Sequence, residues 1–519
     1  MNSILKFHKE IYRLPALILS LLVTVSCQDQ LEQPLQNQDI VENTDYSETS
    51  NMILMLYGSY AELNNLQWET FPIISVRGDD VNAAGDQEPL IGTDEFRYDR
   101  NFWMYNSTWL NLYSDILYWH GAMEEIEKYK EAAADAATAD QYIAEIKVMR
   151  AFEMLQLARL WERILIPESS EPSALFNIQL SSFEEVMQHL SAQMDEAIPL
   201  LPNVRPNERT DVPGGVTRHT ALAVKAMTHL ELQDYQTVAD ATSQIIGANA
   251  FSLVEDYYQL FKIPCKLSDE SLLELQYSDF GMASGTRTRY LWNFFGPSNW
   301  TPAVEGSGGG WGFWEPSVKY IKFMLDRGER ERLETTVLFT PDGIAEIQSD
   351  PNYANLPDWG SNTTQSGDVF NNHPRYNFLS GKFYLPSNQL TPGRFTYGEN
   401  NNFQVIRYSQ ILLMHAEALV SGATSSSLSA DEAVNVVRAR AGMAPLSGVT
   451  IDNVLDEKFA ELGTEWGIRF YDLTRYNRTD ELNYAGRSYD PATDRYLPYP
   501  LEQQDILPQI KEAAENNNS

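Results

Sequence analysis

Cysteine and histidine are scarce in this sequence, and their scarcity limits the chemistry that the chain can support. Only two cysteines and seven histidines stand among 519 residues. The histidines show no metal-ligand spacing, and the H-E-x-x-H motif is absent. The G-x-S-x-G nucleophile elbow and the glycine motifs that bind phosphate are absent too. We therefore expect no enzyme activity, no metal centre and no cofactor.

Positive charge and long apolar runs are also in short supply. Lysine and arginine number 38 against 72 acidic residues, which gives a formal net charge of −34. A field of that sign argues against nucleic acid or anionic lipid as a partner. No segment after residue 26 has the length and hydropathy of a membrane span. Aromatic residues are plentiful instead, with 11 Trp, 27 Tyr and 22 Phe, enough to line a recognition surface.

The N-terminus has the pattern of a secretory signal that ends at a cysteine. Basic residues precede an apolar run at 14–25, which is followed by the small residue Ser26 and then by Cys27. This order predicts a bacterial lipoprotein signal at 1–26, with Cys27 acylated as the mature N-terminus, although Thr24 stands where an aliphatic residue is usual. An ordinary cleaved signal with an incidental cysteine is the alternative. Residues 27–49 are polar and aperiodic and predict a flexible tether.

Helical periodicity dominates the rest of the chain. Apolar residues recur at helical spacing in segments 51–64, 109–117, 141–161 and 183–194. Serines followed three residues later by glutamates, as in Ser182 and Glu185, predict capping boxes. Two pairs of segments predict helical hairpins of the tetratricopeptide type. Their helices are expected at 217–232 with 236–246, and at 405–420 with 429–441.

Aperiodic stretches rich in rings separate these helices. They lie at 77–103, 278–314 and 341–376. Long irregular loops on a helical body usually carry function, and rings this dense argue against disorder. We therefore predict an all-α, tetratricopeptide-like superhelix with long irregular loops and few short strands. The domain is expected at 50–519, with an N-terminal helical part at 50–277 and a loop-rich and C-terminal helical part at 278–519.

The C-terminal third contains a series of recognisable motifs. In residues 405–418, Arg407-Tyr is followed by Leu-Leu and Ala-Glu-Ala. This segment resembles the RY-x-x-x-L-L-x-x-A-E-A helix of the SusD/RagB family of outer-membrane nutrient-binding lipoproteins of Bacteroidetes. Residues 457–475 resemble its E-R-x-x-E-L-x-x-E-G-x-R-x-x-D-L-x-R segment, except that Lys458 replaces arginine and Trp466 is inserted. Residues 496–500 are similar to its closing L-P-x-P. The charged residues of these motifs are interpreted as pairs at helix junctions.

The resemblance implies a function without covalent chemistry. A protein of this family would stand on the outer face of the outer membrane through the lipid on Cys27. It would bind a glycan and deliver it to a SusC-like, TonB-dependent transporter. No cofactor is expected, apart from incidental Ca²⁺ on acid-rich loops.

The candidate binding residues come from two of the ring-rich stretches. A pyranose presents an apolar face that stacks on an aromatic ring, and hydroxyls that need polar groups at the ring's edge. One stretch supplies this mixture through Tyr290, Trp292, Asn299 and Trp300. The other supplies it through Asp80, Asn82, Tyr98 and Trp103. Each ring has the alternative role of anchoring a loop in the core, which is the role we expect of Trp311 and Trp314.

Three other functions remain open from the sequence alone. The same scaffold could bind a peptide or another nutrient. A secreted glycoside hydrolase would need two carboxylates that meet in space, for which Asp79 and Asp80 are the nearest candidates. A purely structural repeat adaptor would have no need of the ring-rich loops.

Overall fold

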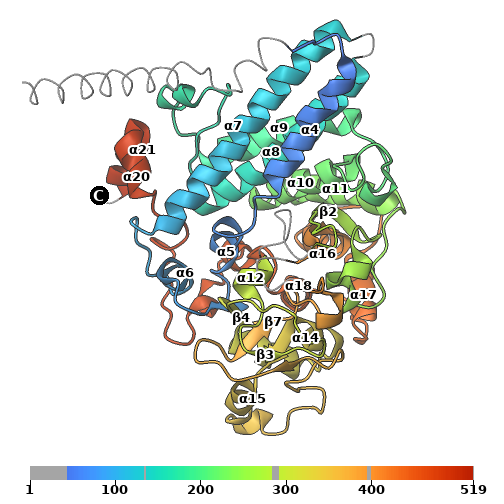
Figure 1. Cartoon of the computed structure of the whole chain (residues 1–519), viewed down its shortest axis with the longest axis vertical. Coiled ribbons are helices and arrows are strands. Elements are labelled where there is room, and N and C mark those ends of the chain that lie inside the picture. The colour runs from blue at the N-terminus through green and yellow to red at the C-terminus, as the bar shows by residue number, and fades with distance from the viewer. Residues whose placement is uncertain (1–43, 134–135, 283–290, 394–398, 518–519) are drawn as a thin grey trace, which may run out of the picture.

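The computed structural model describes residues 44–133, 136–282, 291–393 and 399–517. Long helices occupy one end of the molecule, and short helices, strands and loops fill the other (Figure 1). This architecture confirms the predicted fold class, a mainly helical protein with few short strands. Within the described ranges, no helix has both the length and the hydropathy to cross a membrane. The predicted signal, Cys27 and Tyr290 lie outside the described residues.

The long helices form a stack in which each packs against its neighbours along the chain. Contacts join α7 to α8, α8 to α9, α10 to α11, α11 to α16 and α16 to α17. Both predicted hairpins, α10–α11 and α16–α17, are therefore present. The helices of the stack are α4 (Ile53–Leu63), α7 (Trp103–Ala132), α8 (Ala137–Trp161), α9 (Phe183–Ala197), α10 (Arg218–Glu231), α11 (Tyr235–Gly247), α16 (Tyr408–Val420) and α17 (Ala430–Arg440).

Local capping fixes where several of these helices begin. At α9 the backbone N–H of Glu185 donates to Ser182 Oγ at 3.3 Å, and the Glu185 carboxylate accepts from the backbone N–H of Ser182 at 2.7 Å. Ser429 and Glu432 form the same reciprocal pair at the start of α17. These bonds satisfy backbone donors that have no partner inside the helix. Both capping boxes are thus confirmed.

One predicted helix starts later than expected. Residues 405–407 belong to strand β8 (Phe403–Arg407), and α16 begins only at Tyr408. β8 pairs antiparallel with β2 (Ser271–Leu275), which contributes hydrogen bonds that a helical sequence pattern does not reveal. The pairing also joins the two parts of the chain on either side of residue 277.

Most of the remaining elements gather at the loop-rich end, but α20 (Leu501–Ile506) and α21 (Pro508–Asn517) lie beside the helical stack, where α20 contacts α7 (Figure 1). Three further two-stranded sheets pair β1 (Val81–Ala83) with β4 (Trp314–Pro316), β3 (Trp300–Thr301) with β6 (Val369–Phe370), and β5 (Val337–Phe339) with β7 (Phe378–Ser380), all antiparallel. The other helices are α5 (Thr70–Ser75), α6 (Glu88–Asp94), α12 (Leu291–Phe295), α13 (Val318–Asp326), α14 (Glu331–Thr336), α15 (Pro341–Gln348), α18 (Ile451–Leu462) and α19 (Ile468–Arg475). The largest hydrophobic core of the described residues includes side chains of the long helices, such as Trp109, and side chains of the loop-rich end, such as Trp314.

Candidate functional site

The charged residues of the C-terminal motifs are buried and paired with one another. Arg407 is 1% exposed and reaches three carboxylates, with Nη1 at 3.0 Å from Glu270, Nε at 2.9 Å from Glu465, and Glu461 in direct contact. Burial by itself raises the pKa of Glu461, but the guanidinium groups of Arg440 and Arg407 bring that pKa well below its usual range. These charges hold α16, α17 and α18 in register, and the predicted structural role is confirmed.

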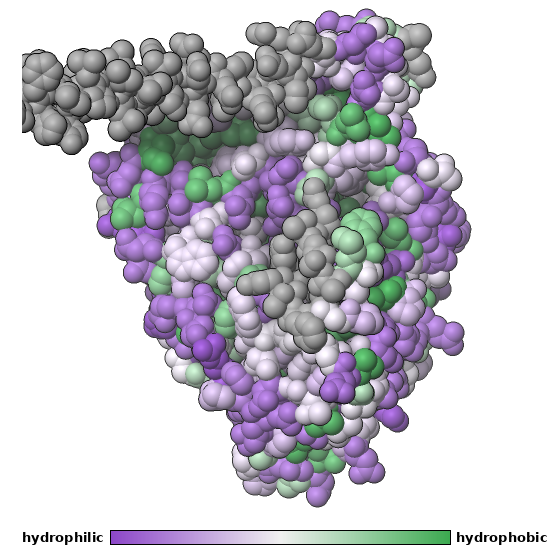
Figure 2. All heavy atoms as spheres, in the orientation of Figure 1, coloured by the Kyte–Doolittle hydropathy of each residue, from purple (hydrophilic) through white to green (hydrophobic). Residues whose placement is uncertain are grey.

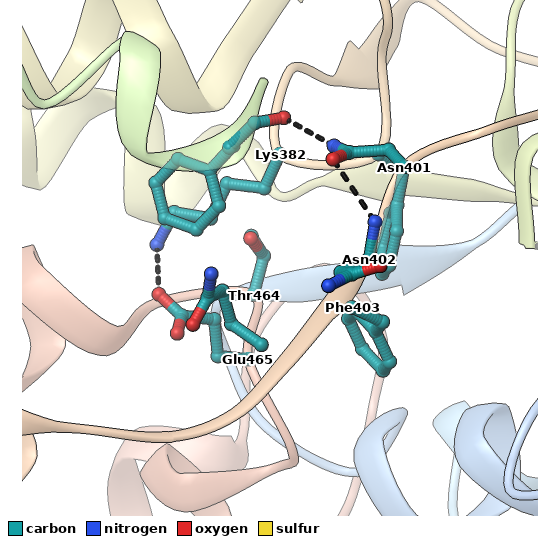
Figure 3. A pocket seen from close by; sticks show the side chains of 9 residues that line it. Lys382, Asn401, Asn402, Phe403, Thr464 and Glu465 are labelled. Carbon is teal, nitrogen blue, oxygen red and sulfur yellow. Dashed lines mark hydrogen bonds and ion pairs between the residues drawn. The ribbon is translucent and has the colours of Figure 1, made fainter. Parts of the chain in front are cut away.

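A small enclosed pocket lies beside this network. Lys382 points toward Glu465, and its ammonium lies 2.6 Å from the carboxylate (Figure 3). The Lys382 ammonium also donates to the backbone carbonyl of Gly463 at 2.7 Å. Burial lowers the pKa of Lys382 to about 8. The cavity between these residues and Asn402 measures about 10 Å³, which is the space of about one water molecule. It is too small to receive a substrate.

The adjacent carboxylates Asp79 and Asp80 serve the scaffold as well. Asp79 lies 2.8 Å from Arg469 and 2.5 Å from Lys319 and has no exposed surface. Asp80 is 1% exposed and accepts the backbone N–H of Thr464 at 2.6 Å. Burial raises the pKa of Asp80 to about 6. Both carboxylates bind residues more than 200 positions away in the chain and present no surface to a sugar here.

Among the described residues, no group of three or more His, Cys, Asp or Glu side chains is placed to hold a metal ion.

The aromatic loop, which we define as residues 291–314 from α12 to the start of β4, contains three of the predicted binding residues. Trp292 is 3% exposed and contacts the half-buried Trp300 edge to face, with ring centroids 5.7 Å apart. Trp300 stacks on Phe370 of the paired strand β6, with centroids 6.3 Å apart and ring planes 9° apart. Asn299, beside Trp300, is exposed. Trp292 therefore supports Trp300 from within the core.

Polar contacts and glycines fix the shape of this loop. The Tyr376 hydroxyl accepts the backbone N–H groups of Ser298 and Asn299 at 3.2 and 3.1 Å. The side-chain amide of Asn299 donates to a backbone carbonyl of the neighbouring loop at 2.7 Å. A Cβ at Gly310 would lie 2.4 Å from the backbone oxygen of Trp292, so the chain closes up there only with glycine. The rings are consequently held on a rigid frame.

Trp311 lies at the surface of the same loop. Its side chain is 41% exposed, whereas Trp314 is completely buried. Trp311 contacts Phe294 edge to face at 5.1 Å, and Phe294 stacks on Trp68 with centroids 3.7 Å apart. The expectation of a core role is confirmed for Trp314, while Trp311 combines anchoring with exposure. In the sequence, only the glycines on either side of Trp311 indicated this exposure, because glycine has no side chain that could cover the indole.

The second predicted segment is divided between two places. Asn82 lies on β1, and that strand adjoins the aromatic loop because Ala84 donates its backbone N–H to Phe313 at 3.0 Å. The Asn82 side-chain oxygen accepts from Arg487 at 2.9 Å. Tyr98 donates instead to the backbone carbonyl of Asp494 at 3.0 Å and packs in a separate aromatic cluster.

Trp103 begins α7 and is 43% exposed, as part of the helical stack. The structure therefore brings together Trp292, Asn299, Trp300 and the strand that carries Asn82. The face of the molecule in Figure 2 is largely hydrophilic, with separate hydrophobic areas.

Comparisons with known proteins agree with this architecture. Residues 269–517 match the model of the SusD family. Over these residues, just under half of its length, the chain is similar to the SusD family. It is 22% identical to a SusD-like protein of Bacteroides ovatus over 493 residues, which cover 90% of this chain and 83% of the relative. It is 23% identical to the SusD-like protein P25 of Formosa agariphila over 443 residues, 80% of this chain and 79% of the relative.

Solved structures show the same fold. A laminarin-binding SusD-like protein superposes with a TM-score of 0.74 at 20% identity, and the match covers 88% of this chain and 97% of that one. The surface glycan-binding protein A of Bacteroides thetaiotaomicron, solved in complex with laminarihexaose, gives a TM-score of 0.69 at 22% identity with the same two coverages.

Proposed function

We propose that this protein binds a glycan on its aromatic loop and has no catalytic activity of its own. The observation that carries the proposal is the pair of partly exposed indoles, Trp300 and Trp311, on one loop that is fixed by Tyr376 and by glycines. The glycan-binding descriptions of two SusD-like neighbours support it. No cofactor enters this proposal.

The chemistry of the loop suits a sugar. An indole face held flat by a second ring offers its apolar surface to the C–H face of a pyranose, with no entropy spent on ordering the ring. Trp300 has such support from Phe370. The exposed amide of Asn299 and the ion pair between Arg375 and Asp86, at 2.8 Å and about half exposed, supply hydrogen-bonding groups nearby. Arg375 belongs to this region because its backbone carbonyl accepts the N–H of Gly85 at 3.4 Å.

Affinity electrophoresis through a panel of polysaccharides (laminarin, starch, xylan, mannan and pectin) tests glycan binding. We expect retardation by at least one polymer, and a loss of about tenfold in affinity for Trp300→Ala and for Trp311→Ala. Tyr118→Ala is the matched control, because Tyr118 is 42% exposed on α7, outside the aromatic loop. If none of the polymers retards the wild-type protein, the proposal fails. Release of reducing sugar from the bound polymer would overturn the non-enzymatic part.

The same proposal places the protein on the outer face of the outer membrane, attached through acylated Cys27, where it would deliver glycan to a SusC-like TonB-dependent transporter. The N-terminal sequence pattern and the family resemblance support this step. Membrane fractionation of Cys27→Ala checks the anchor, and we expect this variant to leave the membrane fraction. Co-purification with a barrel partner checks the transport role, and repeated purification without one would contradict it.

A further inference from the structure

The small pocket beside Lys382 is lined by side chains that are themselves buried. Each of its nine lining residues is at most 7% exposed. Its space of about 10 Å³ is about the smallest that admits one water molecule. In the view of Figure 3, Thr464 lies between Glu465 and Asn402 on this lining. The lining consists of Phe261, Lys382, Phe383, Asn401, Asn402, Phe403, Gln404, Thr464 and Glu465.

The charged groups on this lining already have their partners. The ammonium of Lys382 has three N–H donors. It directs them at the Glu465 carboxylate at 2.6 Å and at the backbone carbonyls of Gly463 and Glu461 at 2.7 and 3.2 Å. The Glu465 carboxylate in turn accepts from Arg407 on both of its oxygens, each at 2.9 Å. The ion pair beside the pocket is therefore complete without a further ligand.

Two buried oxygens on the same lining differ from these groups. Oε1 of Gln404 and Oγ1 of Thr464 have no hydrogen-bond partner among the described residues. Gln404 is 7% exposed and Thr464 is 2% exposed. The orientation of the Gln404 amide is fixed, because its Nε2 donates to the Glu274 carboxylate at 2.8 Å. Buried polar atoms without a partner cost free energy, and a bound molecule that pairs with both would remove that cost.

The two oxygens and the size of the pocket determine which kind of molecule fits. An amide oxygen only accepts, and a hydroxyl both donates and accepts, so the partner of Gln404 Oε1 must be a donor. Water is such a donor and has the right size, whereas a sugar unit is far too large. A cation is disfavoured by the ammonium of Lys382 on the same lining.

A water at this place would also support a turn with an uncommon backbone. The turn 463–467 joins α18 to α19, and in it Thr464 and Trp466 have positive φ angles of 67° and 48°. Direct bonds hold the turn. Asp80 accepts the backbone N–H of Thr464 at 2.6 Å, and the Trp466 indole donates to the backbone carbonyl of Gln404 at 2.8 Å. A water between the side chains of Gln404 and Thr464 adds a second link from β8 to this turn.

We propose that the pocket is a binding site for one ordered water molecule, which bridges Gln404 Oε1 of β8 and Thr464 Oγ1 of the turn 463–467. The water donates one hydrogen to the amide oxygen and forms a second hydrogen bond with the hydroxyl. It is a structural component of the scaffold, and the proposal does not depend on glycan binding.

A crystal structure of this protein, at a resolution that shows ordered water, tests the site directly. We expect a density peak at about 2.7–3.0 Å from both Gln404 Oε1 and Thr464 Oγ1. In crystals of Thr464→Val the peak should be lost. Contacts shorter than about 2.5 Å would identify a metal ion, and this result would overturn the proposal. The absence of any peak in the wild-type protein would overturn it as well.

Thermal unfolding of Thr464→Val tests the bridge in solution through the sign of the change. If the water bridges the two side chains, valine removes one of its partners, and Tm should fall by about 1–3 °C. If the hydroxyl has no partner, valine removes an unsatisfied polar group. Tm would then rise or stay unchanged, which would refute the bridge.

Thr70→Val is the matched control for this measurement. Thr70 Oγ1 is also buried and without a partner among the described residues, but Thr70 does not line this pocket. Its replacement by valine should not lower Tm. An equal fall in both variants would contradict the bridge. Should Thr464→Val fail to fold, the wild-type crystal structure decides alone.

Discussion

The interior of the C-terminal helices and the aromatic loop use polar groups in opposite ways. In the helices, Arg407 and its three carboxylates are buried together and present almost nothing to solvent. In the loop, neutral groups such as Asn299 stay exposed, and rings such as Trp311 are only partly covered. The charges fix which helix lies beside which, and the loop keeps the surfaces that a ligand can reach. The shared sequence motif therefore belongs to the scaffold, and the residues that we propose to bind a glycan lie outside it.

The largest expected effect comes from breaking the buried charge network. Arg407→Ala removes one positive charge from the buried cluster of Glu270, Glu461 and Glu465, in which Arg440 and Lys382 remain, so negative charge is left in excess and we expect the free energy of unfolding to fall by about 3–5 kcal/mol. Urea denaturation measures the change. The glycan affinity of the fraction that stays folded should be unchanged, because Arg407 ends strand β8, is 1% exposed and presents almost no surface to a ligand.

An exposed arginine provides the matched control. Arg97 pairs with Glu88 and Glu95, but its side chain is 53% exposed. Water and salt weaken such pairs, so Arg97→Ala should cost less than about 1 kcal/mol. If Arg407→Ala and Arg97→Ala lost equal free energy of unfolding, burial would not be the reason why the charge network stabilises the fold.

A second prediction concerns the pH dependence of stability that arises from two buried carboxyl groups in the helical stack. Asp115 on α7 and Glu153 on α8 are buried carboxyl groups that, unlike Glu461, form no ion pair with a basic side chain of the described residues. Burial, helped by the nearby Glu62, raises the pKa of Asp115 to about 8. Burial and Asp115 likewise raise the pKa of Glu153. The folded state therefore holds protons that the unfolded state releases.

The sign follows from this proton difference. Stability from Asp115 is fully present below the ordinary pKa of an aspartate, about 4, and is lost as pH rises toward about 8. Asp115→Asn should remove this dependence, with a gain of at most about 3 kcal/mol relative to wild type between about pH 5 and pH 7. Urea denaturation across that range checks it. A constant difference between variant and wild type at every pH would refute the neutral carboxyl.

Local patterns in the sequence predicted the scaffold well. The hairpins and capping boxes depend on residues within four positions of one another, and periodicity makes them visible. Strand β8 was missed because its hydrogen bonds go to β2, more than 100 residues earlier. Asp79 and Arg469, which pair across the chain, were likewise not predicted as partners. Residues that pair over a long distance in the chain have no characteristic spacing, so the sequence pattern does not reveal them.

The candidate site was less predictable, because composition does not fix exposure. Trp292 and Trp311 stand in equally ring-rich surroundings, yet one is 3% and the other 41% exposed. The difference arises from the fold of the loop, which turns Trp292 into the core beside Tyr384.

A third prediction concerns the frame of the aromatic loop. In Gly310→Ala the added Cβ would meet the backbone oxygen of Trp292 at 2.4 Å, so the loop must shift. Overpacking of this kind costs about 1–3 kcal/mol in unfolding free energy. The free energy of glycan binding should be reduced by more than the free energy of unfolding, because the shift of the loop moves Trp300 and Trp311 relative to each other. Gly247→Ala, with open space around its Cβ at the end of α11, is the control: it should leave glycan affinity unchanged and should not lower stability. Unchanged binding by Gly310→Ala would argue against a rigid platform.

The smallest effect is expected where the scaffold depends on a local contact alone. Ser182→Ala removes the side chain that accepts from the backbone N–H of Glu185, and the free energy of unfolding should fall by about 1 kcal/mol. Ser429→Ala, which removes the equivalent cap of α17, should cost the same within error. Thermal and urea denaturation measure both. Because each cap concerns one helix end, the two losses should add in the double variant, whereas Arg407→Ala combined with a substitution of Glu461 should fall short of additivity. A cap variant as damaging as Arg407→Ala would mean that these helix ends, and not the long-range charges, determine the fold of the scaffold.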